Sequence, residues 1–596
     1  MLEISVPAEF EVPDKANVAD LVFDNAANFP QDGCIRLRAG STWTDLSSAD
    51  FASQVRALAK GFIAAGYAAG ERIAIMSSTR FEWTLCDYAL STAGIVVVPI
   101  YETSSAEQVE WILADSAARA VIVETAGNSS VVEGLRDQLA ELQDVWSIEA
   151  GDIEALTKRG ADISDDEVDT RRHATQSTDL ATIVYTSGTT GRPKGCQLTH
   201  RNIIFDAQNT LCSVGDIFVP GTSTLLFLPL AHVLARMIQH AAILARVRLG
   251  HSNDIANLLP DLESFTPSFL LAVPRVFEKV YNSAAAKAAA EGKGKIFAVA
   301  AKTAIDYSKA LDAGSPSIGL RLRRAIFDKL VYGRLRAALG GQCSSAVSGG
   351  GPLGERLGHF FRGIGITIYE GYGLTETSPV TSMNNKQALR IGSVGQPIPG
   401  ASFRIAQDGE LLIKGEHVFG GYWKNEQATA EVLVDGWLHT GDVGAIDRDG
   451  FLRITGRKKE IIVTAGGKNV APAVLEDRLR ANALVSQCIV VGDGKPFIGA
   501  LLTLDEEALP GWLSSHSKPA DLSGAQLAQD ADVHAAIQEA VDEANKAVSK
   551  AESIRKFVIL DHDLTEANGY LTPSMKIRRR NVQDDYAAKI EQIYTS

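Results

Sequence analysis

A run of hydroxyl, glycine and lysine residues follows the short apolar segment 181–184 and has the composition of a phosphate-binding loop. Glycines let the backbone turn tightly and expose its N–H groups, while hydroxyls and a lysine supply further donors to phosphate oxygens. The segment lacks the GxxxxGK[ST] spacing of a Walker A loop. Clusters of Ser, Thr and Gly are usually plain loops, but this density of donors favours phosphate binding. The candidate residues are Thr186, Ser187, Gly188, Thr189, Thr190, Gly191 and Lys194.

A second glycine cluster, residues 348–354, contains the spacing GxGxxG after a short apolar run. With Glu370 downstream, this spacing is typical of dinucleotide binding. Pro352 stands where the helix of that motif should form, and an NAD-dependent oxidoreductase would leave the 186–194 loop unexplained. The oxidoreductase stays as an alternative from another class, which cofactor titration would test. The candidate nucleotide-binding residues here are Gly349, Gly350 and Gly351.

A third cluster, residues 369–377, brings an aromatic ring, hydroxyls and a carboxylate within a few positions of one another. The ring of Tyr372 could stack on a base, and Glu376 could hold Mg²⁺ because this ion prefers hard oxygen ligands. Each residue alone fits an ordinary turn, so the prediction depends on the three clusters together. The further candidates for nucleotide contact are Glu370, Gly371, Gly373 and Thr375.

Length and charge limit the classes of protein that this sequence could form. A chain of 596 residues exceeds one hydrophobic core, so we expect at least two domains. Lys and Arg number 58 against 72 Asp and Glu, a net charge of −14 that argues against bulk binding of nucleic acid. The six cysteines form no CxxC pair, and the N-terminus lacks the features of a signal peptide. We therefore expect a cytoplasmic protein.

The elements that must position these clusters alternate between strand and helix. Segments 50–125 and 180–273 combine helical spacing with short apolar runs, which predicts an α/β fold with a parallel or mixed sheet. Residues 283–340 have three helical patterns, which indicates a helical insertion. From about residue 400 to 456, short strands and Asp-Gly turns predict a small β-rich sub-domain, and a compact α/β tail follows.

Taken in order, these motifs resemble those of the acyl-adenylate-forming superfamily, over nearly the whole chain. The resemblance implies a large N-terminal domain, residues 1–456, and a small mobile C-terminal domain, residues 457–596. It assigns the phosphates to the first loop and adenine to the two later glycine segments. It also implies ribose contacts from Asp442 and Arg457 and a hinge at Lys459.

Within the superfamily, the sequence most resembles long-chain fatty-acid–CoA ligases. Three features support this: segment 273–279 followed by the helical insertion, the adenine segment 370–375, and the loop 464–470 after the hinge. Two positions depart from the usual pattern. Val463 replaces a lysine found in many members, and Cys196 replaces a more usual aliphatic residue and is interpreted as a packing residue.

The resemblance implies a two-step reaction that uses ATP, Mg²⁺ and coenzyme A. A long-chain fatty acid becomes acyl-AMP with release of pyrophosphate, and the acyl group then passes to coenzyme A. Thr186 and Glu376 would hold Mg²⁺. Lys576 would lie between the carboxylate and the α-phosphate, where a cation stabilises the converging negative charge.

The second step is expected to follow a rotation of the C-terminal domain about Lys459. The rotation would withdraw Lys576 and bring Gly466, Gly467 and Lys468 to coenzyme A. His232 resembles a residue of the acyl pocket, although a lone histidine in an apolar run is as often a satisfied core residue. The alternative function is an acyl-AMP ligase that loads a carrier protein, and the glycine-lysine loop argues against it.

A segment near residues 321–336 carries basic residues and apolar residues at helical spacing. In an acidic protein, such a helix could dock on anionic lipid at the inner face of a membrane. The simpler alternative is a helix packed on the main domain with a solvated basic face. A homodimer is also left open. The basic residues are Arg321, Arg323, Arg324, Lys329, Arg334 and Arg336.

Overall fold

The central part of the first half of the chain is a six-stranded sheet in the order β7-β6-β4-β5-β8-β9. The computed structural model describes residues 2–40, 42–186, 192–254, 257–572 and 575–595. The β7 to β8 pairs of this sheet are parallel, and β9 pairs antiparallel with β8. Its strands are β4 (Arg72–Met76), β5 (Val96–Ile100), β6 (Ala120–Val123), β7 (Asp144–Ser147), β8 (Leu180–Thr186) and β9 (Lys194–Thr199).

Helices cover both faces of this sheet, because its strands are almost continuously apolar and must be buried on both sides. They include α2 (Ser48–Ala64), α3 (Phe81–Thr92) and α4 (Ala106–Ser116). Two of these helices begin with a serine whose hydroxyl accepts a backbone N–H, the usual way to satisfy a helix N-terminus. Alternating strands and helices therefore form the α/β fold that the sequence predicts.

A second sheet in the order β12-β13-β14-β15-β16 carries the later glycine clusters. Strands β12 (Phe269–Ala272), β13 (Ser345–Ser348) and β14 (Thr367–Gly373) are parallel, and β15 (Val380–Met383) returns antiparallel to β14. The carboxyl ends of parallel strands share one sheet edge, which is where α/β proteins place their ligands. The glycine residues after β13 and at the end of β14 lie at that edge.

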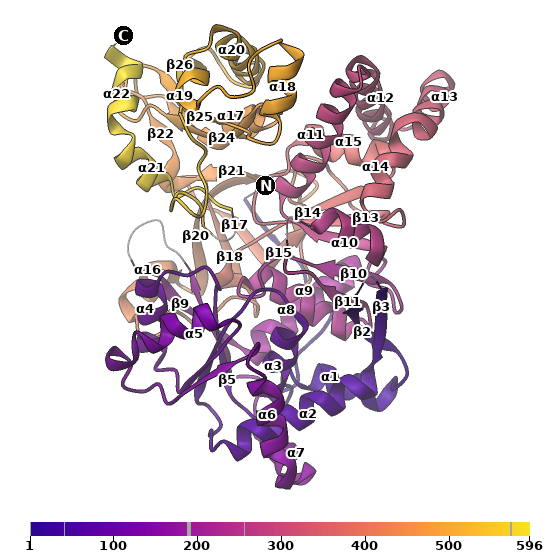
Figure 1. Cartoon of the computed structure of the whole chain (residues 1–596), viewed down its shortest axis with the longest axis vertical. Coiled ribbons are helices and arrows are strands. Elements are labelled where there is room, and N and C mark those ends of the chain that lie inside the picture. The colour runs from indigo at the N-terminus through magenta and orange to yellow at the C-terminus, as the bar shows by residue number, and fades with distance from the viewer. Residues whose placement is uncertain (1, 41, 187–191, 255–256, 573–574, 596) are drawn as a thin grey trace.

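Helices fill the chain between β12 and β13. They are α11 (Pro274–Ala290), α12 (Gly294–Asp312), α13 (Ile318–Phe327), a π-helical turn (Asp328–Tyr332) and α14 (Gly333–Ala338). Figure 1 shows them projecting from one side of the molecule, where α12 also packs against α15 (Glu355–Ile364).

A separate antiparallel sheet forms from residues near 400–457 and includes a strand from the very start of the chain. Strand β1 (Glu3–Ser5) pairs with β17 (Ser402–Ile405), which continues to β18 (Glu410–Lys414) and β20 (Trp437–Ile446). Strand β21 (Leu452–Arg457) pairs with β20 and leads into the C-terminal part of the chain.

The C-terminal part has its own three-stranded sheet, β24 (Val485–Val491), β25 (Ile498–Leu504) and β26 (Ile554–Ile559), with its own apolar core. It lies at one end of the molecule, above the larger N-terminal part in Figure 1. This arrangement, a large and a small α/β unit, confirms the predicted fold class. Within the described ranges, no helix is both long and apolar enough to cross a bilayer.

Candidate active site

The paired strands β8 and β9 hold the two ends of the predicted phosphate loop together. Thr186 ends β8 and lies opposite Lys194, which begins β9, and the Thr186 hydroxyl donates to the Lys194 carbonyl at 3.4 Å. The Lys194 ammonium lies 5.1 Å from the centroid of the Tyr422 ring. The other predicted residues of this loop, Ser187, Gly188, Thr189, Thr190 and Gly191, lie outside the described residues.

Glu376 faces the same end of this strand pair. It belongs to a short 3-10 turn, η4 (Thr375–Thr377), and the Tyr422 hydroxyl donates to Glu376 Oε1 at 2.7 Å. The buried Cys196 thiol interacts electrostatically with Glu376 and by hydrogen bonding with Thr186, so all three side chains are neighbours. Burial, more than the nearby carboxylate, raises the pKa of this thiol well above its usual value, which keeps it unreactive.

Thr186 and Glu376 fit a Mg²⁺ site of the kind that is completed by a substrate. Mg²⁺ needs six oxygen ligands and usually takes only one or two from protein carboxylates, with water and phosphate oxygens supplying the rest. No group of three or more His, Cys, Asp or Glu side chains that could hold a metal occurs among the described residues. A hydroxyl and a carboxylate beside the predicted phosphate loop therefore suit a metal that arrives with a nucleotide.

Asp442 is buried between an aromatic residue and a cation. The Tyr372 hydroxyl donates to Asp442 Oδ2 at 2.6 Å, and Arg457 Nε lies 3.1 Å from Asp442 Oδ1. Asp442 and Arg457 are register partners on β20 and β21, so the sheet itself sets this pair. The three residues that sequence resemblance links to adenosine are thus brought into one cluster.

Glu370 holds the backbone of the glycine loop at residues 349–354. It is buried, and its Oε1 accepts the Leu353 backbone N–H at 2.9 Å. Burial raises the pKa of Glu370 to about 7. Because this carboxylate is occupied by the backbone of residues 349–354, it is not free to bind a ribose as a dinucleotide fold requires. The geometry therefore weighs against the oxidoreductase alternative.

The glycines of this region are required by close approach. A Cβ at Gly373 would lie 1.6 Å from the Pro379 carbonyl oxygen, and one at Gly371 would lie 3.0 Å from the Ser382 carbonyl oxygen. Gly350 has φ +81°, which favours glycine. Gly349 and Gly351 follow the end of β13 on the same loop.

Lys576, from the C-terminal part of the chain, lies within electrostatic range of Asp442, Arg457 and Glu376. Its backbone N–H donates to the Thr572 hydroxyl at 3.1 Å, and the Thr572 N–H donates to the Lys576 carbonyl at 2.8 Å, which closes a tight turn. Lys576 keeps exposed surface, yet protein atoms lie close enough around its ammonium to desolvate it in part. This surrounding protein, and secondarily Arg457, lowers the pKa of the Lys576 ammonium, while Asp442 and Glu376 oppose the shift.

His232 meets Lys576 from the N-terminal part. It caps α9 (Val233–Leu244), where its Nδ1 accepts the Leu234 N–H at 3.1 Å. Burial and the nearby Lys576 ammonium lower the pKa of His232 to about 3, so the ring is neutral at physiological pH. The predicted lysine therefore lies beside the predicted histidine, although they are distant in sequence.

The predicted hinge residue lies at the connection between the two parts, and the predicted coenzyme A residues lie a few positions later, in the C-terminal part. Lys459 lies in the 3-10 turn η5 (Lys458–Glu460) and is exposed, whereas Lys458 pairs with Asp408 at 2.5 Å. Residues 466–468 are exposed in the loop between β22 (Ile462–Val463) and β23 (Asn469–Val470). Lys468 pairs with Glu552 at 3.1 Å, and both residues belong to the C-terminal part.

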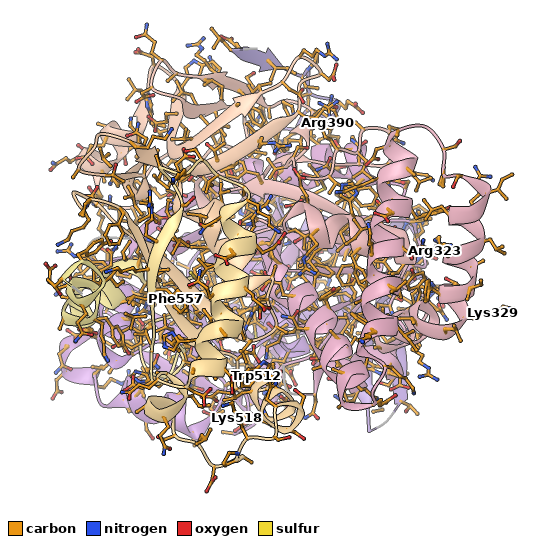
Figure 2. All side chains as sticks on the ribbon, turned by 90° about the horizontal axis from the view of Figure 1, so that it is seen from above. Arg323, Lys329, Arg390, Trp512, Lys518 and Phe557 are labelled. Atoms are coloured by element: carbon orange, nitrogen blue, oxygen red, sulfur yellow. The ribbon has the colours of Figure 1, made fainter. Side chains whose placement is uncertain are left out.

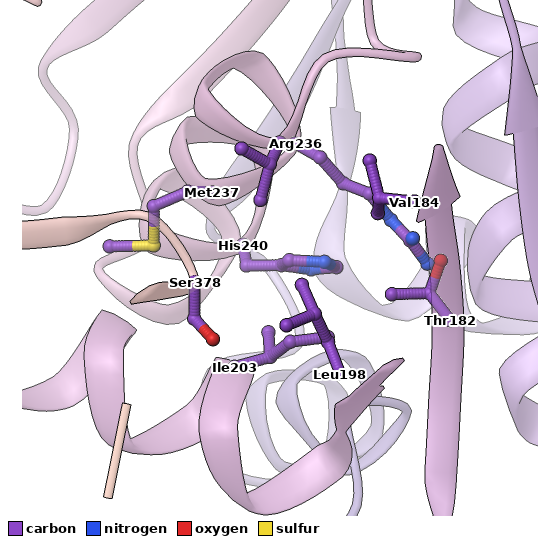
Figure 3. Close-up of a pocket in the computed structure, with 9 residues that line it drawn as sticks. Thr182, Val184, Leu198, Ile203, Arg236, Met237, His240 and Ser378 are labelled. Atoms are coloured by element: carbon purple, nitrogen blue, oxygen red, sulfur yellow. The ribbon is translucent and has the colours of Figure 1, made fainter. Parts of the chain in front are cut away.

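Figure 3 shows a small cavity whose lining includes Arg236 and His240, two buried polar residues that no sequence motif indicated. This cavity of about 10 Å³, the space of one water molecule, lies between β8, α9 and the chain after η4. Arg236, on α9, donates from Nε to Asp87 at 3.1 Å, and Gln239 donates to the same carboxylate at 2.7 Å. This buried ion pair joins α3 to α9, the helix that begins beside His232. In the sequence, the only sign of this ion pair is a single acidic residue, Asp87, within an apolar helical run.

Comparison with known proteins defines the class to which this site belongs. The family described as AMP-binding enzyme matches residues 22–423, and the AMP-binding enzyme C-terminal domain matches residues 459–596. The chain therefore belongs to the AMP-binding enzyme family.

Individual relatives narrow the similarity further. The chain is 54% identical over the full length of both proteins to a long-chain-fatty-acid–CoA ligase, FadD15, of Mycobacterium bovis. It is 32% identical to the long-chain-fatty-acid–CoA ligase ACSBG2 of Xenopus laevis, over 94% of this chain and 81% of that protein.

Solved structures share the fold at low sequence identity. The anthranilate CoA ligase AuaEII with anthranoyl-AMP has a TM-score of 0.72 at 18% identity, covering 98% of this chain and 99% of that one. The O-succinylbenzoate coenzyme A synthetase MenE of Bacillus subtilis with AMP has a TM-score of 0.67 at 20% identity, covering 95% and 98%.

Proposed function

We propose that this protein is an ATP-dependent long-chain fatty-acid–CoA ligase that forms acyl-AMP and pyrophosphate and then acyl-CoA and AMP. The observation that carries the proposal is that Lys576 lies within electrostatic range of Asp442, Glu376 and His232, which come from separate elements of the N-terminal part. A full-length relative at 54% identity, named a long-chain-fatty-acid–CoA ligase, supports the same reaction.

In the first step, a fatty carboxylate attacks the α-phosphate of ATP and pyrophosphate leaves. Lys576 would be the cation that offsets the repulsion between carboxylate and phosphate, an effect that lowers the barrier by several kcal/mol in related electrostatic sites. Thr186 and Glu376 would hold Mg²⁺, which neutralises charge on the phosphate oxygens when bound. Lys194, at the base of the loop, would contribute a further positive charge. Asp442 would accept the ribose hydroxyls.

The adenine is expected to bind between the glycine segments of the second sheet. Residues Gly349, Gly350 and Gly351 expose backbone at one side, and Gly371, Gly373 and Thr375 at the other. Tyr372 offers a ring whose hydroxyl is already fixed on Asp442 at 2.6 Å, so little side-chain entropy remains to be lost on stacking. Glu370 acts on this site through the backbone that it supports.

In the second step, the thiol of coenzyme A attacks the acyl-adenylate. Lys459 would act as the pivot of a rotation that removes Lys576 and brings residues Gly466, Gly467 and Lys468 to the pantetheine arm. Gly467 has φ +76°, and a Cβ there would meet no atom within 4 Å. Glycine is therefore favoured here by the backbone conformation and not by close packing. The loop is exposed, and its ion pair with Glu552 lies within the C-terminal part, so the pair would be kept during such a movement.

His232 is proposed as a neutral lining residue of the acyl pocket. Its pKa of about 3 means that it carries no charge at physiological pH, so it offers no ion pair to the carboxylate. It can contact the carboxyl end of the acid while Lys576 supplies the positive charge.

The experiment that tests the function measures pyrophosphate release with acids from acetate to long chains, with and without coenzyme A. We expect release to increase with chain length, and acyl-CoA to form only with coenzyme A present. Acyl-AMP that accumulates in the presence of coenzyme A and moves only to a carrier protein would instead identify the alternative ligase. NAD reduction without pyrophosphate release would overturn the proposal.

A peripheral contact with anionic membrane is proposed for α13. This helix has no buried residue, and its apolar side chains point outward: Ile318 is 86% exposed, Leu322 65% and Ile326 50%. At about 100° per residue, these three positions span about 80° of the helix surface. By the same helical spacing, Arg321 lies at one edge of this apolar arc and Arg323 at the other.

The chemistry of this surface matches an anionic bilayer. Apolar side chains can enter the boundary between headgroups and acyl chains, while flanking cations meet anionic headgroups. Arg324 and Arg336 instead hold the helical region to the main body, by donating to the Gly363 and Ile364 carbonyls. Figure 2 shows Lys329 at the outer edge of the molecule, on this side. A protein of net charge −14 that concentrates cations here has a local rather than a general affinity for anions.

Vesicle flotation tests the contact. Wild type is expected to float with vesicles that contain anionic lipid and to remain in the bottom fraction with zwitterionic vesicles. The double variant Leu322→Ser, Ile326→Ser is expected to lose flotation. Because both side chains are exposed, the variant should fold normally. Equal flotation of both proteins would contradict the contact. Concentration-dependent light scattering that changes with the variant would identify a homodimer on this face instead.

A further inference from the structure

One helix of the N-terminal part makes charged contacts with the C-terminal part. Arg275 lies in the first turn of α11 and donates from Nη2 to Asp505 Oδ2 and to Ser486 Oγ, both at 3.2 Å. Its Nη1 lies 3.3 Å from Glu278 of the same helix. The Arg275 and Asp505 side chains are each only 15% exposed, so the ion pair is largely shielded from water.

The position of Arg275 has a cost that needs a compensating contact. A cation in the first turn of a helix opposes the helix dipole. Asp505 is fixed to receive it, because Asp505 Oδ1 accepts the backbone N–H groups of Glu507 and Ala508 and leaves Oδ2 for the guanidinium. Asp505 is therefore held by the backbone of its own part, and Arg275 by Glu278 of its own helix, independently of the contact between them.

Two further contacts follow along the same boundary. Lys279, one helical turn after Arg275, pairs with Glu507 at 2.7 Å, and these side chains are 45% and 66% exposed. Arg356, on α15, donates to the Ala481 carbonyl at 3.2 Å and lies over the Tyr281 ring of α11. Figure 1 shows α11 reaching the C-terminal part near α18 (Leu509–Ser515), in agreement with their contacts.

The same orientation of the C-terminal part places Lys576 beside His232 and Asp442. Helix α11 starts directly after β12, in the sheet that carries the adenine segments. A contact at α11 therefore fixes the C-terminal part relative to the strands that hold the nucleotide. The two events, α11 pairing and Lys576 insertion, occur in one orientation.

We propose that Arg275 and Lys279, paired with Asp505 and Glu507, form an α11 latch that holds the C-terminal part in the orientation for acyl-AMP formation. The proposal rests on the function proposed above. All four are positioning residues, since they act through the placement of Lys576. The latch must open before a rotation about Lys459, so it favours the first half-reaction only. The modest number of pairs and the exposure of Lys279–Glu507 keep opening feasible.

The exposed pair offers a clean test by charge reversal. Lys279→Glu and Glu507→Lys should each slow acyl-AMP formation by up to about 10-fold, in the range of ordinary conformational coupling, and the double swap should restore most of the rate. Thioester formation from supplied acyl-AMP and coenzyme A should stay at the wild-type rate or rise. Arg275→Ala should act in the same direction and more strongly. Lys302→Glu is the matched control, because Lys302 pairs with Asp306 of its own helix at 3.0 Å.

A second readout follows the orientation without any activity. Spin labels at the exposed positions 287 and 550, in a Cys212→Ser background, report the distance between α11 and the C-terminal part. The single reversals should shift the distance distribution away from that of wild type, and the double swap should restore it. Unchanged distances, or an equal slowing of both half-reactions, would overturn the latch. Failure of wild type to release pyrophosphate would overturn the proposed function, while the distances would still decide the latch.

Discussion

Two tyrosines orient the carboxylates that are proposed to bind Mg²⁺ and ribose. Tyr422 donates to Glu376 at 2.7 Å, and Tyr372 donates to Asp442 at 2.6 Å. A hydrogen bond to an ionised group is stronger than one between neutral groups and limits the rotation of the carboxylate. The oxygens that are to meet Mg²⁺ and ribose are therefore directed before the ligands arrive.

Replacement of Tyr422 by Phe tests the orientation of Glu376. Outer-shell partners of metal ligands commonly change metal affinity by 10- to 100-fold. We expect Tyr422→Phe to raise the Mg²⁺ concentration for half-maximal acyl-AMP formation by about 10-fold, with a smaller effect at saturating Mg²⁺. A titration of Mg²⁺ at fixed ATP measures this. An unchanged half-saturation point would show that Tyr422 does not orient Glu376.

The pH dependence of the first half-reaction tests the charge of Lys576. Surrounding protein lowers the pKa of its ammonium below the usual 10.5, so the cation is lost at a lower pH than in a free lysine. We expect acyl-AMP formation to fall as pH rises through this lowered pKa. In Lys576→Arg, whose cation persists, the slower reaction should keep its rate to higher pH. Identical alkaline limbs in both proteins would assign the titration to another group.

Contiguous motifs were predictable from the sequence, and contacts across long separations were not. Thr186, Asp442 and Lys576 stand in short runs whose residue types indicate chemistry. Tyr422–Glu376, Arg236–Asp87 and Arg275–Asp505 are pairs separated by 46, 149 and 230 residues. No local pattern identifies such partners, because their proximity arises only when the sheets and helices pack.

At the scale of elements, the strands of the first sheet follow the sequence closely. In segment 50–125, where helical spacing and short apolar runs were predicted to alternate, the apolar runs form β4, β5 and β6, because strands buried on both faces are recognisable as short runs rich in β-branched residues. Strand β1 escaped prediction. Its three residues are stabilised by pairing with β17, about 400 residues away, and have no periodicity of their own.

The loop that follows β13 depends on Glu370 of β14, and this gives a test by stability. The folded pKa of about 7 exceeds the usual value of 4.5, so protonated Glu370 favours the folded state, and that contribution is lost as pH rises from about 4.5 through 7. Glu370→Gln stays neutral and keeps a carbonyl for the Leu353 N–H. We expect its stability advantage over wild type to grow with pH and to approach about 3 kcal/mol above pH 7.

Urea unfolding of both proteins between pH 5 and pH 8 measures this difference. Comparison at each pH removes the titration of all other groups, which the two proteins share. A difference that does not vary with pH would mean that Glu370 is ionised throughout and that its burial has another compensation.

At the scale of the whole molecule, the composition and motif order predicted the α/β class and the large and small units. They did not predict the orientation of the C-terminal part, because this depends on interface contacts such as those of α11. That orientation decides whether Lys576 reaches Asp442 and Glu376. Under the proposed mechanism, this orientation of the C-terminal part is the one for acyl-AMP formation.

The most direct measurement is single-turnover acyl-AMP formation by Lys576→Ala, with a long-chain acid and ATP. We expect a fall of about 10²–10³ in this rate, because the cation between carboxylate and α-phosphate is lost. Conversion of supplied acyl-AMP by coenzyme A should stay close to the wild-type rate. Formation of acyl-AMP by Lys576→Ala at the wild-type rate would contradict the account.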